Sequence, residues 1–253
     1  MNITTVLPIS RLTYLDRVID SLLAQTLKPN NLLVVFDGHD SQFIEVRNKI
    51  VGLPFDSVIC IPSTNTAPAH TIQDRRRHIS KIHNQFRELV QDADWIFSIE
   101  DDGILPPNAL ERLVELVSTH GNVGMATGVE LGRWGVPYVG AWRVNNIDEP
   151  TEINSIEMSE SSIEEIDACG LYCALIRADK YKEHVFFYNN GLGPDVNLGI
   201  YLRQQGFNNY IDWSIPVTHL TLIDGKESEI HPSQKSRAVK LRFLYGDVWQ
   251  ASH

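Results

Sequence analysis

The feature that most constrains the fold is an apolar run that ends in three consecutive acidic residues. The run Trp95-Ile96-Phe97-Ser98-Ile99 is rich in β-branched and aromatic residues, and Glu100, Asp101 and Asp102 follow it directly. Such a run suits a strand buried on both faces, and the interior of a buried strand cannot hold three carboxylates. The acids must therefore lie at the end of the strand.

A helix is predicted directly behind the acidic triplet. Pro107 suits a first helical turn, and apolar residues recur at helical spacing from Leu110 to Val117. The triplet is thus placed on a strand-to-helix turn, where open α/β sheets bind ligands. Adjacent carboxylates repel one another unless a cation or a donor network offsets their charge, and Mg²⁺ or Mn²⁺ suits oxygen ligands and a substrate phosphate. The alternative is a solvated acidic turn that caps the helix.

The first half of the chain alternates strand and helix patterns. Strands are predicted at residues 3–9, 31–36, 57–61, 95–99 and 123–127, with helical patterns between them at residues 12–23, 43–50 and 72–90. Repeated β-α units predict an α/β fold with a mostly parallel sheet and right-handed crossovers. Asp37, presented by the Asp37-Gly38 turn after the second strand, should then share a sheet edge with Asp102.

The second half breaks this alternation. Residues 128–142 contain four glycines together with Trp134, Tyr138 and Trp142, which indicates an irregular segment with aromatic surface or core packing. Further predictions are an acidic excursion or edge strand at 148–167, a buried strand at 168–176, a helix from Asp195 to Gly206, a strand at 210–217 before His219, and a C-terminal helix in the basic and aromatic tail.

Composition narrows the class of protein. The 253 residues suit one large α/β domain, and a formal net charge of -10 disfavours a nonspecific grip on nucleic acid or an anionic membrane. Because the N-terminus lacks a signal pattern and no stretch has the ~18 apolar residues of a membrane span, we expect a soluble, cytoplasmic protein. Cys60, Cys169 and Cys173 match no zinc module and are interpreted as buried reduced thiols.

The order of these features resembles the family-2 glycosyltransferases of the GT-A fold over roughly residues 1 to 220. The segments that carry the resemblance are Pro8-Ile9-Ser10 after the first strand, Val34 to Gly38, the basic residues Arg76 or Arg77, the Asp-x-Asp-like Ile99 to Asp102, Gly193 to Gly206, and Val217-Thr218-His219. The resemblance implies a Rossmann-like GT-A domain at 1–225, with a nucleotide-sugar half (1–127) and an acceptor half (128–225), before a helical tail at 226–253.

The resemblance also implies a reaction and a set of site residues. The reaction is an inverting, metal-dependent transfer of a sugar from a nucleoside-diphosphate sugar to an acceptor hydroxyl. Asp195 is implied as the catalytic base, and Asp102 with His219 as the ligands of Mn²⁺ or Mg²⁺. The implied nucleotide-sugar contacts are Pro8, Ser10, Asp37, Arg76, Arg77, Glu100 and Asp101. Asp37 would hydrogen-bond the base or ribose, which favours a UDP- or dTDP-type donor.

Three departures from the family pattern keep alternatives open. Glu100 replaces the first aspartate of the motif, Pro194 stands where an acid usually precedes the base, and the choice among Arg75, Arg76 and Arg77 is not fixed. The alternatives are a metal-dependent phosphoester hydrolase or nucleotidyltransferase, and a nucleotide-sugar-binding protein without catalysis. The sequence leaves the acceptor open among a glycan, a lipid-linked sugar, a small molecule, a protein and a modified DNA base, and it leaves the donor sugar and oligomeric state open too.

Overall fold

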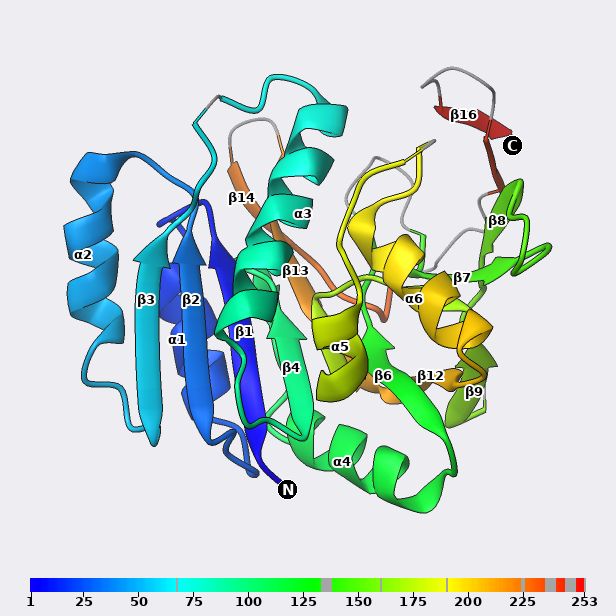
Figure 1. The fold of residues 1–253 in the computed structure, drawn as a ribbon, viewed down its shortest axis with the longest axis horizontal. Helices are drawn as coiled ribbons and strands as arrows, with labels where there is room; N and C mark the ends of the chain where they lie inside the picture. The colour runs from blue at the N-terminus through cyan, green and yellow to red at the C-terminus, as the bar shows by residue number, and fades with distance from the viewer. Residues whose placement is uncertain are drawn as a thin grey trace.

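A large central sheet organises the molecule (Figure 1). The computed structural model describes residues 1–66, 68–132, 138–159, 161–189, 191–223, 226–234, 240–243 and 249–252. Within these residues the sheet has eight strands in the order β3-β2-β1-β4-β11-β6-β12-β9. Their bounds are β1 Ile3–Ile9, β2 Asn31–Phe36, β3 Ser57–Pro62, β4 Trp95–Ile99, β6 Val123–Val129, β9 Ile163–Ile166, β11 Cys173–Arg177 and β12 Asn208–Pro216.

The sheet is mostly parallel, as predicted. β3, β2, β1 and β4 run parallel, and β12 runs parallel to β6. β11 is antiparallel to both β4 and β6, so β6 keeps the direction of β4, and β9 is antiparallel to β12 at the edge. The carboxyl ends of β1, β2 and β4 therefore open on the same edge of the sheet.

Helices cover both faces of the sheet. The helices are α1 (Leu15–Leu23), α2 (Asp40–Ile50), α3 (Ile72–Leu89), α4 (Ala109–Thr119), α5 (Ala178–Glu183) and α6 (Pro194–Gln204). Leu32, Val34 and Phe36 of β2 share a core with α1, α2 and α4, whereas Leu33 and Val35 share the opposite core with α3, α5 and α6. This alternation shows the two-sided burial that the apolar runs predicted.

Two smaller antiparallel sheets lie beside the central one in the described part of the chain. One has the order β14-β13-β5, with bounds Lys226–Ile230, Thr218–Ile223 and Gly103–Ile104. The other has the order β10-β7-β8-β15-β16, with bounds Ala168–Cys169, Ala141–Val144, Glu152–Ser155, Lys240–Phe243 and Trp249–Ser252. The first of these sheets pairs β5, which directly follows the acidic triplet, with β13, the late segment that carries His219.

The predicted C-terminal helix is wrong wherever the structure describes residues 226–253. These residues form β14, β15 and β16 instead, and β15 pairs with both β8 and β16. Val-Lys-Leu-Arg-Phe at 239–243 alternates apolar and basic residues, and this period of two fits a strand rather than a helix. The tail residues Lys235, Arg237, Val239, Leu244 and Tyr245 of that prediction, and likewise Trp134 of the aromatic segment, lie outside the described residues.

The strand predicted at residues 168–176 is divided into β10 and β11. The backbone N–H of Gly170 donates to the carbonyl of Gly140, and the buried Tyr172 hydroxyl donates to the carbonyls of Gly128 and Gly140. These bonds hold a turn in which the chain passes from the small sheet to the central sheet. A continuous apolar pattern does not reveal such a change of partner strand.

Two further findings concern the cysteines and the helices. Cys60, Cys169 and Cys173 are free thiols; Cys169 and Cys173 are buried and Cys60 is half-buried. Among the residues that the structure describes, no helix combines the length and the apolar character needed to cross a membrane.

Close packing of α6 on β10 gives a test of the fold. A Cβ on Gly199 would lie 2.6 Å from the Cα of Ala168 and 2.7 Å from the carbonyl oxygen of Asp167. We expect Gly199→Ala to lower the free energy of unfolding in urea by about 1–3 kcal/mol through overpacking, although alanine is the better helix former. Gly121→Ala is the control, because open space surrounds that position; equal stability of both variants would contradict the tight α6–β10 contact.

Candidate active site

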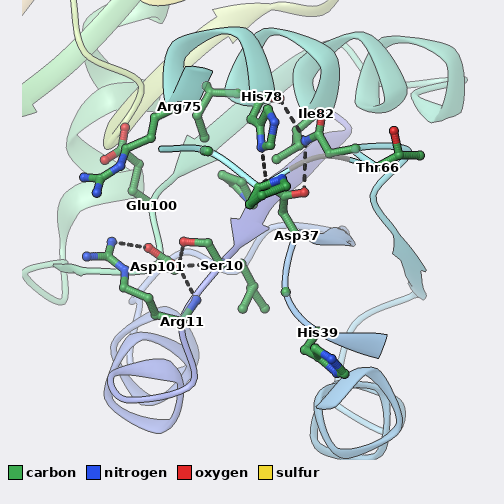
Figure 2. Close-up of a pocket in the computed structure, with 17 residues that line it drawn as sticks. Ser10, Arg11, Asp37, His39, Thr66, Arg75, His78, Ile82, Glu100 and Asp101 are labelled. Atoms are coloured by element: carbon green, nitrogen blue, oxygen red, sulfur yellow. Dashed lines mark hydrogen bonds and ion pairs between the residues drawn. The ribbon is translucent and has the colours of Figure 1, made fainter. Parts of the chain in front are cut away.

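A cavity of about 880 Å³ opens at the sheet edge where β1, β2 and β4 end (Figure 2). Five residues predicted from the sequence line it, namely Pro8, Ser10, Asp37, Glu100 and Asp101. In Figure 2, Asp37 and His78 face each other, and Arg11, Glu100 and Asp101 lie to one side of them. This space is the first cavity.

Asp37 is held by two side chains that the sequence analysis did not select. Asn65 Nδ2 donates to Asp37 Oδ1 at 2.9 Å, and His78 Nδ1 lies 3.4 Å from Asp37 Oδ2. The His78 side chain comes from α3 and Asn65 from the loop after β3. Both Asp37 and His78 are largely buried, with 17% and 13% of their side chains exposed. The arrangement fixes the Asp37 carboxylate in the wall of the first cavity.

Asp101 anchors the loop that follows β1. Its Oδ2 accepts hydrogen bonds from the backbone N–H groups of Ser10 and Arg11, at 2.7 and 2.9 Å, and from the Ser10 hydroxyl at 2.9 Å. Its Oδ1 accepts a bond from the Arg11 guanidinium at 2.6 Å. The middle acid of the triplet is therefore committed to loop residues, although its edge still touches the first cavity.

Asp102 meets His219 because a backbone ladder brings their strands together. β5, directly after the triplet, pairs with β13 so that Gly103 lies opposite His219, and the N–H of Leu220 donates to the carbonyl of Asp102 at 2.7 Å. Both side chains are buried, at 0% and 6% exposed, and His219 Nε2 lies 3.3 Å from Asp102 Oδ2. The structure thus brings together the two residues predicted as metal ligands.

The surroundings of His219 fit a metal ligand. Its Nδ1 lies 3.1 Å from the carbonyl oxygen of Leu131 and 3.4 Å from Glu130 Oε2, and both of these are acceptors. Nδ1 therefore carries a proton, so Nε2, which faces Asp102, is the ring nitrogen that would bind a metal. Metal-binding histidines usually donate their second ring N–H to a carbonyl or carboxylate in this way.

A metal held here would need further ligands from outside the protein. Among the described residues, no group of three or more His, Cys, Asp or Glu side chains is arranged to hold a metal ion. Asp102 and His219 offer one carboxylate and one imidazole. Mg²⁺ and Mn²⁺ often bind through one or two protein ligands, with substrate phosphate and water completing the shell. The donor set therefore fits such an ion together with a diphosphate.

Arg11 is the cation that the structure itself places among these acids. One guanidinium nitrogen lies 2.6 Å from Asp101 Oδ1 and 2.6 Å from Asp102 Oδ2. Burial by itself lowers the pKa of Arg11, but the charges of Asp101 and Asp102 outweigh this effect and raise it. Arg11 is therefore fully charged and offsets the repulsion between the two carboxylates.

A second cavity of about 470 Å³ adjoins the first and shares Arg75, Ile79 and Glu100 with it. Asp195 lines the second cavity from the first turn of α6. Burial raises the pKa of Asp195 above the usual aspartate value, while the charge of Arg76 and the backbone N–H of Val196 oppose the shift. A carboxylate with a raised pKa is a better proton acceptor near neutral pH.

Gly193 leaves room for the Asp195 carboxylate. It caps α6 with ordinary extended dihedral angles, φ -70° and ψ 164°, which any residue can adopt. A Cβ on Gly193 would overlap Asp195 Oδ1. Glycine at this position is therefore explained by the space that the carboxylate occupies and not by backbone strain.

The three arginines of α3 lie in different places. Arg75 lines both cavities, whereas Arg76 lines only the second. Arg76 donates to the carbonyl of Gly191 at 2.5 Å, and Arg76 and Arg77 lie over the Tyr188 ring at 5.8 and 5.5 Å. Arg77 lines neither cavity. The structure thus places Arg75, which the sequence left as an open choice, at the junction of the two cavities.

Sequence reasoning missed four residues of the site. Arg11 directly follows the Pro8-Ile9-Ser10 segment, and Glu130 directly follows a buried strand, so the rule that polar residues gather at strand ends would have found both. Asn65 and His78 lie 28 and 41 residues from Asp37 in the sequence, so their contacts with Asp37 leave no local pattern.

A family model decides the identity of the chain. The model described as "Glycosyltransferase like family 2" matches residues 5–239, which is most of the sequence. The chain belongs to this family. It is accordingly a glycosyltransferase, and the arrangement of its sheets and helices is the GT-A fold that the sequence predicted.

Solved structures agree with the fold of this family 2 glycosyltransferase at low sequence identity. A197 from STIV is 16% identical with a TM-score of 0.53, covering 100% of this chain and 99% of that one. GalNAc-T7, crystallised with UDP, GalNAc and Mn²⁺, is 11% identical with a TM-score of 0.62, covering 89% and 45%. The mannosyltransferase PcManGT from Pyrobaculum calidifontis, with GDP-Man and Mn²⁺, is 14% identical with a TM-score of 0.56, covering 82% and 53%.

The extent of these matches differs between the neighbours. The chain spans nearly all of A197 but about half of GalNAc-T7 and of PcManGT. No curated protein sequence matches the family 2 chain. The similarity to these structures therefore concerns the fold.

The anchoring of the first loop by Asp101 can be tested by unfolding. Asp101→Ala removes the acceptor of three loop donors and one partner of the half-buried Arg11 guanidinium. We expect it to lower the free energy of unfolding by about 2–3 kcal/mol, because hydrogen bonds to a buried charged group are lost. Asp16→Ala is the matched control, because in the described part of the chain Asp16 forms an exposed ion pair with Lys49, and its loss should change stability by less than about 1 kcal/mol. Similar small losses in both variants would contradict the anchor.

Proposed function

We propose that the enzyme is an inverting, metal-dependent transferase that moves a sugar from a nucleoside diphosphate to an acceptor hydroxyl. The observation that carries this proposal is the pair of adjoining cavities with a common wall of Arg75, Ile79 and Glu100. The first cavity has the strand-end acids in its wall and the second has Asp195. Two substrates bound in these spaces would meet at the common wall.

The first cavity is assigned to the nucleotide. Its volume of about 880 Å³ falls in the range of small-molecule sites. Asp37, oriented by Asn65 and His78, would accept a hydrogen bond from the imide N–H of uracil or thymine. Pro8 and Ser10 would line the path of the nucleotide, and Asp101 acts by holding their loop in place.

Glu100 and Arg75 are assigned to the donor beyond the nucleoside. Both line the two cavities at their junction. Glu100 is one methylene longer than the aspartate that it replaces and would reach the ribose or the sugar. Arg75 supplies positive charge where the diphosphate must lie, and Arg76 does so from the second cavity.

Asp102 and His219 would hold Mn²⁺ or Mg²⁺. When bound, the ion supplies positive charge that stabilises the diphosphate as it leaves. The proposal is supported by the buried contact of these two residues and by the carbonyl of Leu131, which faces Nδ1 of His219 and leaves Nε2 for the ion. Mn²⁺ in the structures of GalNAc-T7 and PcManGT is consistent with the same choice of ion.

Asp195 is assigned as the base for the acceptor. In the transfer, the acceptor oxygen forms a bond to the anomeric carbon, the bond from that carbon to the diphosphate breaks, and the acceptor proton passes to the Asp195 carboxylate. A single displacement of this kind inverts the configuration at the anomeric carbon. The apolar and aromatic wall of the second cavity, including Tyr138, Trp142 and Leu171, would pack against the acceptor or the sugar.

No specific observation favours a hydrolase or nucleotidyltransferase. Such an enzyme would need further carboxylates or histidines placed as metal ligands. The described residues contain no group of three or more His, Cys, Asp or Glu side chains that could hold a metal ion. A nucleotide-sugar-binding protein without catalysis is the remaining alternative, and it would bind the same donor without turning it over.

Metal-dependent nucleotide binding is the first test of the proposal. Thermal unfolding would be measured with UDP, dTDP and GDP, each with and without Mn²⁺, for the wild type, Asp102→Asn and the surface control Asp16→Asn. A nucleotide at one hundred times its dissociation constant should stabilise the wild type and the control by about 2.7 kcal/mol. Asp102→Asn should lose the part of this stabilisation that depends on Mn²⁺. An equal Mn²⁺ effect in all three proteins would overturn the assignment of Asp102.

Loss of the base should reduce turnover without reducing nucleotide binding. We expect Asp195→Asn to lower kcat for transfer to an acceptor by about 100- to 10,000-fold, the usual contribution of a general base. The same thermal shift with UDP and Mn²⁺ should remain. In the wild type, kcat should fall as the pH drops through the raised pKa of Asp195, because only the carboxylate accepts the proton.

Gly193→Ala gives a second test of the same carboxylate. It keeps Asp195 but displaces it from the space beside Gly193, so kcat should fall while nucleotide binding is unchanged. Gly121→Ala is the control for the added methyl group. Turnover can be followed as UDP released from UDP-sugars with a panel of hydroxyl acceptors. Full turnover by Asp195→Asn would exclude Asp195 as the base, and donor binding without turnover by the wild type on the whole panel would favour the binding protein.

A further inference from the structure

The guanidinium of Arg11 lies between the carboxylates of Asp101 and Asp102, where the two negative charges attract a cation. A single nitrogen lies 2.6 Å from an oxygen of each carboxylate. The Asp102 side chain is fully buried and that of Asp101 is 7% exposed, whereas Arg11 is 36% exposed and lines the first cavity. Two adjacent buried carboxylates need such a charge to remain ionised together.

The bond from Arg11 to Asp102 is not needed to hold the loop. The backbone of Arg11 and both polar groups of Ser10 are already fixed by Asp101 Oδ2. The guanidinium adds its contact to Asp102 beyond this anchor. Among the described residues, the buried Nε of Arg11 has no hydrogen-bond partner, so the hydrogen-bonding capacity of this side chain is not fully used. The contact between Arg11 and Asp102 can therefore break without loss of the loop.

The same oxygen of Asp102 contacts both Arg11 and His219. Asp102 Oδ2 is the atom that faces His219 Nε2 at 3.3 Å, and it is also the atom bound by the guanidinium. A divalent ion held by Asp102 and His219 would meet the positive charge of Arg11 at that oxygen. We propose that Arg11 is the resident counter-cation of the donor-free enzyme and that a divalent ion must displace its guanidinium from Asp102.

The displacement couples metal binding to donor binding. This inference rests on the metal site proposed above. Asp101 Oδ1 retains the guanidinium after it leaves Asp102, so two positive charges then lie close together at the first cavity. The diphosphate of the donor offsets their repulsion. Metal alone binds weakly, and metal with the nucleotide binds tightly, because each ligand raises the affinity of the other by the same factor.

Calorimetric titration with Mn²⁺ tests the proposal without any measurement of turnover. The proteins are the wild type, Arg11→Met and the control Arg17→Met, each titrated with and without UDP. Arg17→Met removes the same charge from a surface ion pair with Glu229. Because displacement breaks a charge-assisted hydrogen bond, we expect Arg11→Met to bind Mn²⁺ alone about tenfold or more tightly than the wild type. The control should match the wild type, and UDP should raise Mn²⁺ affinity less in Arg11→Met than in the wild type.

Thermal unfolding supplies a second readout that does not depend on the nucleotide. In buffer with a chelator, Arg11→Met should melt at a lower temperature than the wild type, because Asp101 and Asp102 lose their counter-cation. Mn²⁺ alone should raise its melting temperature more than that of the wild type. Arg11→Lys retains one cation on the loop and serves if Arg11→Met does not fold; its Mn²⁺ affinity should lie above that of the wild type, since a lysine bridges the two carboxylates less well.

The outcomes separate this inference from the proposed function. Suppose that the wild type binds Mn²⁺ in the presence of UDP but the Arg11 variants bind Mn²⁺ alone no more tightly than the wild type. The role of Arg11 as counter-cation is then overturned, whereas the proposed metal site is supported. If no protein binds Mn²⁺ with or without UDP, the metal site fails and this inference fails with it. Tighter binding in Arg17→Met as well would assign the effect to net charge and would also overturn the role of Arg11.

Discussion

The structure depends on how the acids at the end of β4 are neutralised. A strand buried on both faces delivers Asp101 and Asp102 into an interior where ionised carboxylates are costly. The protein meets that cost with the loop after β1 and with His219 of β13. Segments from the beginning, middle and late part of the chain converge here. The loop after β1 also lines the first cavity together with the ends of β2 and β4 and part of α3, so the bonds that fix this loop also shape the cavity.

The three acids have three separate environments. Glu100 lies in the common wall of both cavities, Asp101 is bonded to the first loop, and Asp102 is buried against His219. The side chains of these successive residues point in different directions, so one motif supplies a cavity wall, an anchor for the first loop and a buried partner of His219. A motif of this kind must be interpreted one residue at a time.

Local pattern predicted the parts of the fold that local energetics decide. The strands at Ile3–Ile9, Asn31–Phe36 and Trp95–Ile99 have the predicted bounds, because their apolar runs are buried on both faces. The C-terminal helix was predicted wrongly, since its described residues 240–242 pair with residues 152–154 of β8, which are 86 to 90 positions away in the sequence. The contact of Asp102 with His219 agrees with the sequence-based grouping, whereas Arg11, Asn65 and His78 emerged only from tertiary contacts.

The placement of Asp195 shows why a distant helix can complete the site. The sequence indicated an acid in a first helical turn, a position at which a cap is the common explanation. Here the N-cap of α6 is Gly193, which has no side chain. The Asp195 carboxylate occupies the space beside Gly193, in the wall of the second cavity. Gly199 lets the same helix pack closely on β10. One glycine therefore sets the position of α6 and the other gives room to its acid, so the place of Asp195 in the wall of the second cavity follows from two missing side chains.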